Sequence, residues 1–65
     1  MCLSNVYLNE KKQERLLIEE ASQIVADSKG IQVNTLLAES KRLEDYYISE
    51  VNLMENYVLL KKRKE

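Results

Sequence analysis

Residues 25–33, VADSKGIQV, place a candidate turn between two segments of β-forming residues. Asp27 begins the turn and Gly30 ends it, and a short loop that starts with Asp and contains Gly is typical of a β-hairpin. We expect Gly30 to adopt the positive φ that follows a type I turn in such hairpins. In the segment IQVNTL, Ile31 and Val33 would share one face of the second strand. The stretch therefore predicts a β-hairpin.

The rest of the chain also fits short strands. SNVYL and SEVNLMENYVLL carry β-branched and aromatic residues between polar ones. The segment MEN predicts a turn between a strand that ends near Leu53 and a final strand over residues 57–60. The segment NEKKQE predicts a polar turn between Leu8 and Leu16.

A helical hairpin is an alternative that fits the same chain. Between Glu10 and Ser28 apolar residues recur at helical spacing, with Asn9 as a candidate N-cap and Gly30 just beyond the end. A second seam repeats every three or four residues and consists of Leu36, Ser40, Leu43, Tyr47, Val51, Met54 and Val58. No proline interrupts either half, so periodicity alone leaves both folds open.

The length of the chain limits how it can be stabilised. With 65 residues it forms one small domain, which we assign to residues 1–60 with a basic tail over residues 61–65. A domain of this size buries only about 60% of its unfolded surface. The single cysteine excludes an intramolecular disulfide, so oligomerisation or a metal is expected to add stability. Adjacent apolar pairs, Leu16–Leu17 and Leu59–Leu60, put apolar residues on both strand faces and predict a homodimer.

Composition argues against an enzyme. The chain has no histidine, so neither Cys2 nor any serine has an imidazole to activate it. It has one glycine, which excludes a glycine-rich phosphate loop. The net charge of −1 gives no overall basic footprint for nucleic acid. Only the tail, residues 61–64, offers a weak contact to RNA or to an acidic surface.

No segment is typical of a signal peptide or long enough to cross a bilayer. We therefore expect no membrane partner and a cytoplasmic protein, in which Cys2 stays reduced. We interpret the four tyrosines as packing residues and Met54 as core filler.

Cys2 is the candidate metal ligand. Its sulfur and its own nitrogen would close a five-membered chelate, and thiolate with amide or amine nitrogen favours square-planar Ni(II) or Cu(II). One chain supplies one thiolate, but a homodimer supplies two if the cysteines meet at the symmetry axis. Removal of Met1 would free the amine of Cys2. The competing interpretation of Cys2 is a small buried apolar residue.

Four segments, MCLSNVYL, LLIEEASQIV, DSKGIQVNTLLAESK and ISEVNLMENYVLL, together resemble the CooT family. These are small nickel-binding proteins found with carbon monoxide dehydrogenase systems, and the family is also catalogued as predicted RNA-binding proteins. The resemblance covers nearly the whole chain, and its most specific parts are Met1-Cys2 and VNLMENYVLL. The Met-Cys start also resembles the hydrogenase maturation chaperone HypC, although a chain without histidine departs from that protein's iron chemistry.

The resemblance implies a compact all-β, barrel-like fold of about six or seven short strands in a homodimer. It implies that Cys2 is the nickel ligand and that the client is a nickel enzyme such as carbon monoxide dehydrogenase. Because only a dimer brings two thiolates together, we expect about one Ni(II) ion per dimer. Two other functions remain open: an RNA-binding β-barrel module, and a metal-free dimeric interaction domain.

Overall fold

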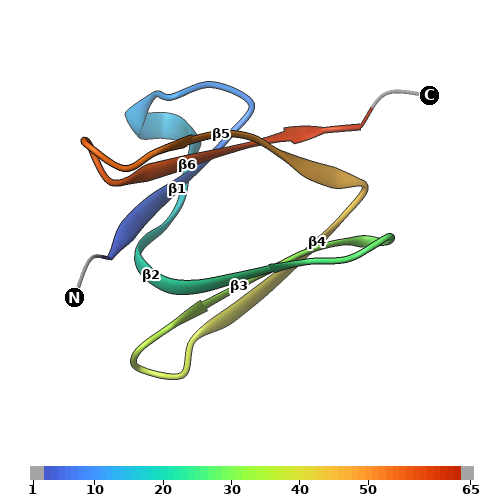
Figure 1. Ribbon diagram of the computed structural model, residues 1–65, viewed down its shortest axis with the longest axis horizontal. Helices are drawn as coiled ribbons and strands as arrows, with labels where there is room; N and C mark the ends of the chain where they lie inside the picture. Colours follow the sequence, from blue (N-terminus) through green and yellow to red (C-terminus); the bar gives the residue numbers. More distant parts are fainter. Residues whose placement is uncertain (1–2, 64–65) are drawn as a thin grey trace.

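The computed structural model describes residues 3–63, and in this range the chain forms six β-strands and almost no helix (Figure 1). The strands are β1 (Ser4–Leu8), β2 (Leu16–Ala26), β3 (Gly30–Thr35), β4 (Ser40–Glu44), β5 (Tyr46–Asn52) and β6 (Tyr57–Lys62), and a short 3-10 helix, η1 (Gln13–Arg15), precedes β2. The predicted all-β class is confirmed, and the helical hairpin is wrong. No helix among the described residues is long and apolar enough to cross a membrane.

The strands form one sheet in the order β4-β3-β2-β1-β6-β5. β1 and β6 pair in parallel, and the other neighbours are antiparallel. In Figure 1, β1, β5 and β6 gather in one part of the molecule, β3 and β4 in the other, and β2 bends from the first to the second. The edge strands β4 and β5 are joined by Asp45 alone, which has a φ of 66°, and are not paired with each other. The sheet is therefore barrel-like but open along this seam.

Irregular pairing in β2 explains why its sequence resembles a helix. Ala21 lies opposite Ser4 and Ile18 opposite Val6. Two residues of β2, Glu19 and Glu20, therefore stand against one residue of β1, Asn5. Glu20 has a positive φ of 56°. An extra residue in a strand reverses the face to which the following side chains point. Ile18 and Ala21 are both buried although they are three residues apart, a spacing that also fits one face of a helix.

The core lies on the inner face of the bent sheet. Ile31, Leu60, Val6 and Val33 are completely enclosed, and burial of each stabilises the fold by about 1.5–3 kcal/mol. Tyr57 and Leu59 face outward from β6 but are also buried. The ring of Tyr7 meets that of Tyr57 edge-on at 6.1 Å, and the Lys11 ammonium lies 4.7 Å from the Tyr57 ring centroid.

The expectation that the Leu59–Leu60 pair needs a partner subunit is therefore wrong. Both side chains are covered within one chain, one on each face of β6. Leu16 and Leu17 are half-buried, and Leu17 packs against the core. If two copies associate, other residues must form the contact.

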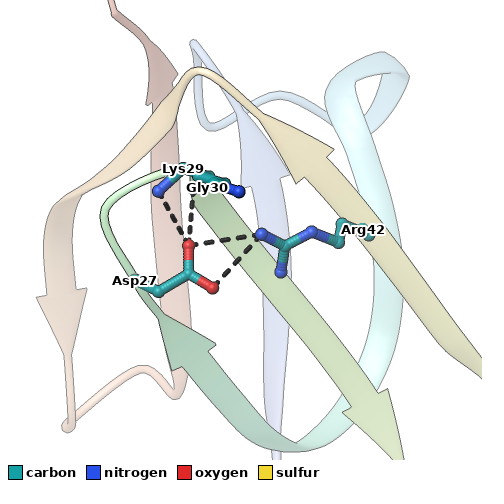
Figure 2. Close-up of polar contacts among 4 residues, drawn as sticks. All are labelled: Asp27, Lys29, Gly30 and Arg42. Atoms are coloured by element: carbon teal, nitrogen blue, oxygen red, sulfur yellow. Dashed lines mark hydrogen bonds and ion pairs between the residues drawn. The ribbon is translucent and has the colours of Figure 1, made fainter.

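The predicted hairpin between β2 and β3 is present. Asp27 Oδ1 accepts hydrogen bonds from the backbone N–H groups of Lys29 and Gly30 at 2.8 and 2.9 Å (Figure 2). Arg42 of β4 donates to both carboxylate oxygens of Asp27 at 3.2 Å. The turn is thus held by its own aspartate and tied to the next strand.

The predicted positive φ at Gly30 is wrong, because no glycine in the chain has one. Glycine is required there for a different reason. A Cβ at Gly30 would overlap the backbone oxygen of Leu43 and lie 2.9 Å from the Cα of Glu44. Gly30 therefore allows β4 to approach β3 closely at the start of their pairing.

The hydrogen bonds to Asp27 predict a pH dependence of stability. The N–H groups of Lys29 and Gly30, followed by the Arg42 guanidinium, hold the pKa of Asp27 below its usual value. A lowered folded-state pKa gives stability that is present above about pH 3.9, the unfolded value, and is lost as the pH falls through the folded value. Asp27→Asn keeps an oxygen acceptor for the turn but has no charge to lose. We expect the difference in Tm between pH 5 and pH 2 to be smaller in Asp27→Asn than in wild type. An equal difference would show that Asp27 does not contribute to acid unfolding.

Candidate functional site

The predicted metal ligand, Cys2, lies outside the described residues, so the site is located by Leu3, the first residue described. Leu3 borders a surface depression of about 310 Å³. The other lining residues are Glu19 and Glu20 of β2, Thr35 of β3, and Leu36, Leu37 and Glu39 of the β3–β4 turn. Leu3 therefore lies beside carboxylates and exposed leucines.

The bulge in β2 helps to form this depression. The backbone N–H of Glu20 donates to Asn5 Oδ1 at 3.2 Å, which ties the bulge to the start of β1. The backbone N–H of Asn5 donates to the carbonyl oxygen of Asn56 at 3.0 Å, which ties the same strand to the β5–β6 turn. Both contacts hold the beginning of β1 in a defined position, although the strand is close to the chain terminus.

Two hairpin turns lie at the same end of the molecule as Leu3. In Figure 1 both turns lie on the left, the β5–β6 turn at the top and the β3–β4 turn at the bottom, and β1 begins between them. Their tips carry exposed apolar residues: Leu37 is 92% exposed and Met54 is 93% exposed, and Leu36 and Leu53 beside them are exposed as well. We use the term N-terminal end for the surface that contains Leu3, Leu36, Leu37, Leu53 and Met54. Adjacent exposed apolar residues mark contact surfaces more often than isolated ones do.

Met54 is therefore not part of the core of one chain, although it can still pack at a contact with another molecule. The exposure of Leu36 and Leu37 was not predicted, because Leu36 fits an apolar seam. The sequence contains a local signal for their exposure. In NTLLAES and VNLMEN, each apolar pair lies between a strand and polar turn residues. Apolar side chains at a hairpin tip cannot reach the core of their own sheet.

The described residues do not form a metal site by themselves. No three Asp, Glu, Cys or His side chains within residues 3–63 are placed to hold an ion together. Glu19, Glu20 and Glu39 would supply only hard oxygen donors, whereas nickel in a square-planar site prefers sulfur and nitrogen. A soft ligand at this end would have to come from Cys2, and its role stays a prediction.

The end of β6, where the basic residues of the predicted tail begin, lies at the opposite end of the molecule from the start of β1 (Figure 1). β6 continues beyond the predicted domain boundary at residue 60, so that Lys62 pairs with Tyr46 and Lys61 with Tyr47. The Arg63 guanidinium lies 6.0 Å from the centroid of the Tyr47 ring. The segment predicted to be a separate tail thus begins inside the sheet.

The tyrosines mostly pack, as predicted. Tyr57 is buried, Tyr46 packs against the core, and Tyr7 is half-buried. The Tyr57 hydroxyl donates to Glu50 at 2.9 Å, and this hydrogen bond raises the pKa of Tyr57. Tyr47 is the only exposed tyrosine. A single ring cannot form a platform on which successive bases stack.

The same arrangement predicts weak RNA binding. Lys61, Lys62, Arg63 and Lys64 can neutralise four phosphates at most, which corresponds to a log–log salt slope no steeper than about −3 for a single strand. We expect any binding of a labelled oligonucleotide to be independent of its sequence and to disappear when these four residues are replaced by serine. Tight binding by that serine variant would show that the RNA surface lies elsewhere.

Comparison with known proteins gives two findings. The sequence model of a family described as "CO dehydrogenase accessory protein CooT" matches residues 1–61. A crystal structure of a protein provisionally described as CooT, from Carboxydothermus hydrogenoformans, superposes with a TM-score of 0.80 over 97% of this chain and 100% of that chain, at 16% identity. At that identity the structural match supports the fold alone. Among curated proteins, no relative matches the chain.

Proposed function

The chain belongs to the CooT family of CO dehydrogenase accessory proteins, and from this premise we propose that it carries nickel, bound through Cys2, to a nickel enzyme such as CO dehydrogenase. The family match includes the Met1-Cys2 start and extends over residues 1–61. As an accessory protein it is not itself an enzyme, and nickel is its cargo. The observation that most supports this proposal is that the only cysteine of the chain directly precedes Leu3 in the sequence, and Leu3 borders the surface depression.

We propose further that two copies associate at the N-terminal end. A single thiolate is a poor nickel site, and association at this end would bring the two Cys2 residues toward one symmetry axis. Leu37 and Met54, which are almost fully exposed in one chain, would be removed from water. Burial of such a side chain is worth about 1.5–3 kcal/mol, a driving force that the buried Leu59–Leu60 pair cannot supply.

The carboxylates beside Leu3 support cation binding at the same place. Glu19, Glu20 and Glu39 outnumber Lys41, which lines a neighbouring depression with them, so the net negative charge would raise the local concentration of a divalent cation. In a dimer joined at this end the two acidic sets would repel each other. A bound Ni(II) ion would relieve that repulsion, so nickel is expected to strengthen association.

A metal titration combined with sedimentation tests the proposal. We expect a dimer at micromolar concentration that binds about one Ni(II) per dimer, with thiolate-to-nickel absorption in the near ultraviolet. Affinity should fall as the pH falls, because the thiolate and amide nitrogens must lose protons to coordinate the metal. The double variant Leu37→Ser/Met54→Ser should be monomeric and should bind nickel much more weakly.

Two outcomes would contradict the proposal. A stable monomer that binds one Ni(II) per chain would show that the metal needs no second thiolate. A dimer without any nickel affinity would favour the metal-free interaction domain.

A further inference from the structure

The two free edges of the sheet differ in chemistry. β4 carries Lys41, which lies opposite the buried Val33 and is therefore on the inner face. Arg42, opposite Gln32, is on the outer face and is paired with Asp27. Inward-facing and edge-strand charges are devices by which natural sheets prevent another strand from pairing. β4 is a protected edge.

β5 has no inward-facing charge, although its pairing with β6 is irregular between Ile48 and Glu50. Ile48 lies opposite Leu60 and Val51 opposite Val58, so both side chains face the barrel interior, yet they are 40% and 53% exposed. The only charged residue of β5, Glu50, accepts the hydrogen bond from Tyr57. An edge strand with apolar side chains and unpaired backbone groups is a template for the addition of a further strand.

A groove behind β5 can receive side chains from such a strand. It has a volume of about 250 Å³ and lies between β5 and β2. Ile48 and Val51 form one wall, Ala21 and Ile24 the other, and Val58 contributes to the lining. In a strand laid along β5, every second side chain would point to this inner face. The groove therefore favours an extended segment with alternating apolar residues.

Three cations lie at one end of β5, next to the acidic residue Asp45, whose carbonyl oxygen accepts a hydrogen bond from the Arg63 backbone N–H. Lys61 pairs with Tyr47, Lys62 pairs with Tyr46, and the Arg63 guanidinium lies over the Tyr47 ring itself. Within residues 3–63 the ion pairs involve Lys11, Lys12 and Arg42, and none of these three cations. They remain available to acidic groups of an incoming strand. We propose that β5 binds an extended, alternately apolar segment of a partner protein by strand addition, with acidic residues of that segment next to Arg63.

The charges favour an acidic partner over a second copy of this chain. In an antiparallel pairing of two β5 strands, the cationic end of each would meet the Asn52 end of the other. That end continues into Leu53 and Met54, which are neutral, and the nearby Glu55 is already paired with Lys11. Self-pairing would thus leave the cations without acidic partners. The inference does not depend on nickel binding, and its test contains no metal.

Fluorescence anisotropy with labelled peptides tests the inference. The probe is a short peptide of alternating valine and threonine, flanked at both ends by glutamate pairs, and the comparison peptide has lysine pairs instead. We expect the acidic peptide to bind about tenfold more tightly at low ionic strength, and the preference to shrink in high salt because exposed charges are screened. N-methylation of alternate backbone nitrogens should abolish binding, because an added strand is held by main-chain hydrogen bonds.

Two matched variants locate the binding surface. Val51→Lys places an inward-facing lysine on β5, as Lys41 does on β4, and should weaken binding of the acidic peptide by about tenfold or more. Val25→Lys is the control, because Val25 is similarly exposed, at 45%, but lies opposite Gln32 on the outer face of β2. It should bind like wild type. Lys61→Ser/Arg63→Ser should abolish the preference for the acidic peptide. Circular dichroism checks that each variant is folded.

Three results would overturn the inference. The first is wild-type affinity in Val51→Lys, and the second is equal affinity of wild type for the two peptides at low salt. The third is a wild-type dimer that becomes a monomer in Val51→Lys, which would show that β5 pairs with a second copy.

Discussion

Gly30→Ala is expected to lower the stability of the fold strongly. The added Cβ would overlap the backbone oxygen of Leu43, and its other close neighbours, Glu44 Cα at 2.9 Å and the Leu43 carbonyl carbon at 3.0 Å, are also backbone atoms. No side chain can rotate away, so the clash is relieved only if β4 moves off β3. That movement would disrupt the pairs Gly30–Glu44 and Ile31–Leu43.

The size of this effect follows from the low stability of a small domain. Overpacking a well-packed interior costs about 1–3 kcal/mol, and a backbone clash lies at the upper end or beyond it. A chain of this length has about 3–10 kcal/mol of total stability. Urea unfolding followed by circular dichroism should therefore show a midpoint far below that of wild type. An unchanged midpoint would show that β4 does not approach Gly30 closely.

Ala38→Gly is the control for this experiment. Ala38, in the β3–β4 turn, has a positive φ of 69°, which glycine adopts without strain. The exchange should raise stability by about 1 kcal/mol. A loss of stability in Gly30→Ala together with a gain in Ala38→Gly would show that position 30 requires glycine for steric reasons, whereas position 38 favours glycine because of its backbone conformation.

Cys2→Ser is expected to remove most of the nickel affinity and all thiolate-to-nickel absorption, while the dimer remains. Oxygen replaces the only thiol of the chain, and a hydroxyl is a far weaker ligand for this metal. Isothermal titration and absorbance measure the loss, and sedimentation measures the dimer. Cys2→Ala should change the unfolding free energy by no more than about 0.5 kcal/mol, because the side chain of a terminal residue supports little of the core.

The double variant Cys2→Ser/Ser4→Cys tests whether the position of the thiol matters. It has the same number of thiols, but the sulfur is now in β1. If the chelate at the chain start holds nickel, this variant should not recover the lost affinity. Full nickel binding by Cys2→Ser, together with unfolding of Cys2→Ala, would show that Cys2 is a buried packing residue.

Local turn chemistry made the hairpins predictable. Asp27 and Gly30 mark the first hairpin, and MEN marks the turn before β6, because turn residues act within a few positions of themselves. The alternation of Ile31 and Val33 likewise placed β3 correctly. The pattern of β2 was ambiguous, because its bulges make inward-facing residues recur at a spacing of three, and bulges depend on the partner strands.

The sequence allowed a prediction of which residue type forms the candidate site, but not of which residues surround it. A lone cysteine at the second position is compatible with a soft-metal ligand or with a buried packing residue, and only the resemblance to the CooT family favours the ligand. The carboxylates of Glu19 and Glu39 are distant in the sequence and come to line the same depression only because β2, β3 and the turn after it meet there. The exposed tips Leu37 and Met54 could not be separated from core residues by their apolar character.

The sequence by itself determined the turns, the absence of histidine and the single thiol, because each of these depends on residues close together or on composition. Only the tertiary structure decided which apolar residues are buried, because burial depends on what the opposing strand places above them. It also decided why Gly30 must be glycine, since the constraint comes from the backbone of β4 rather than from its own φ. The contrast between the protected edge at β4 and the open edge at β5 arises in the same way, because an edge exists only once the strands have been ordered in the sheet.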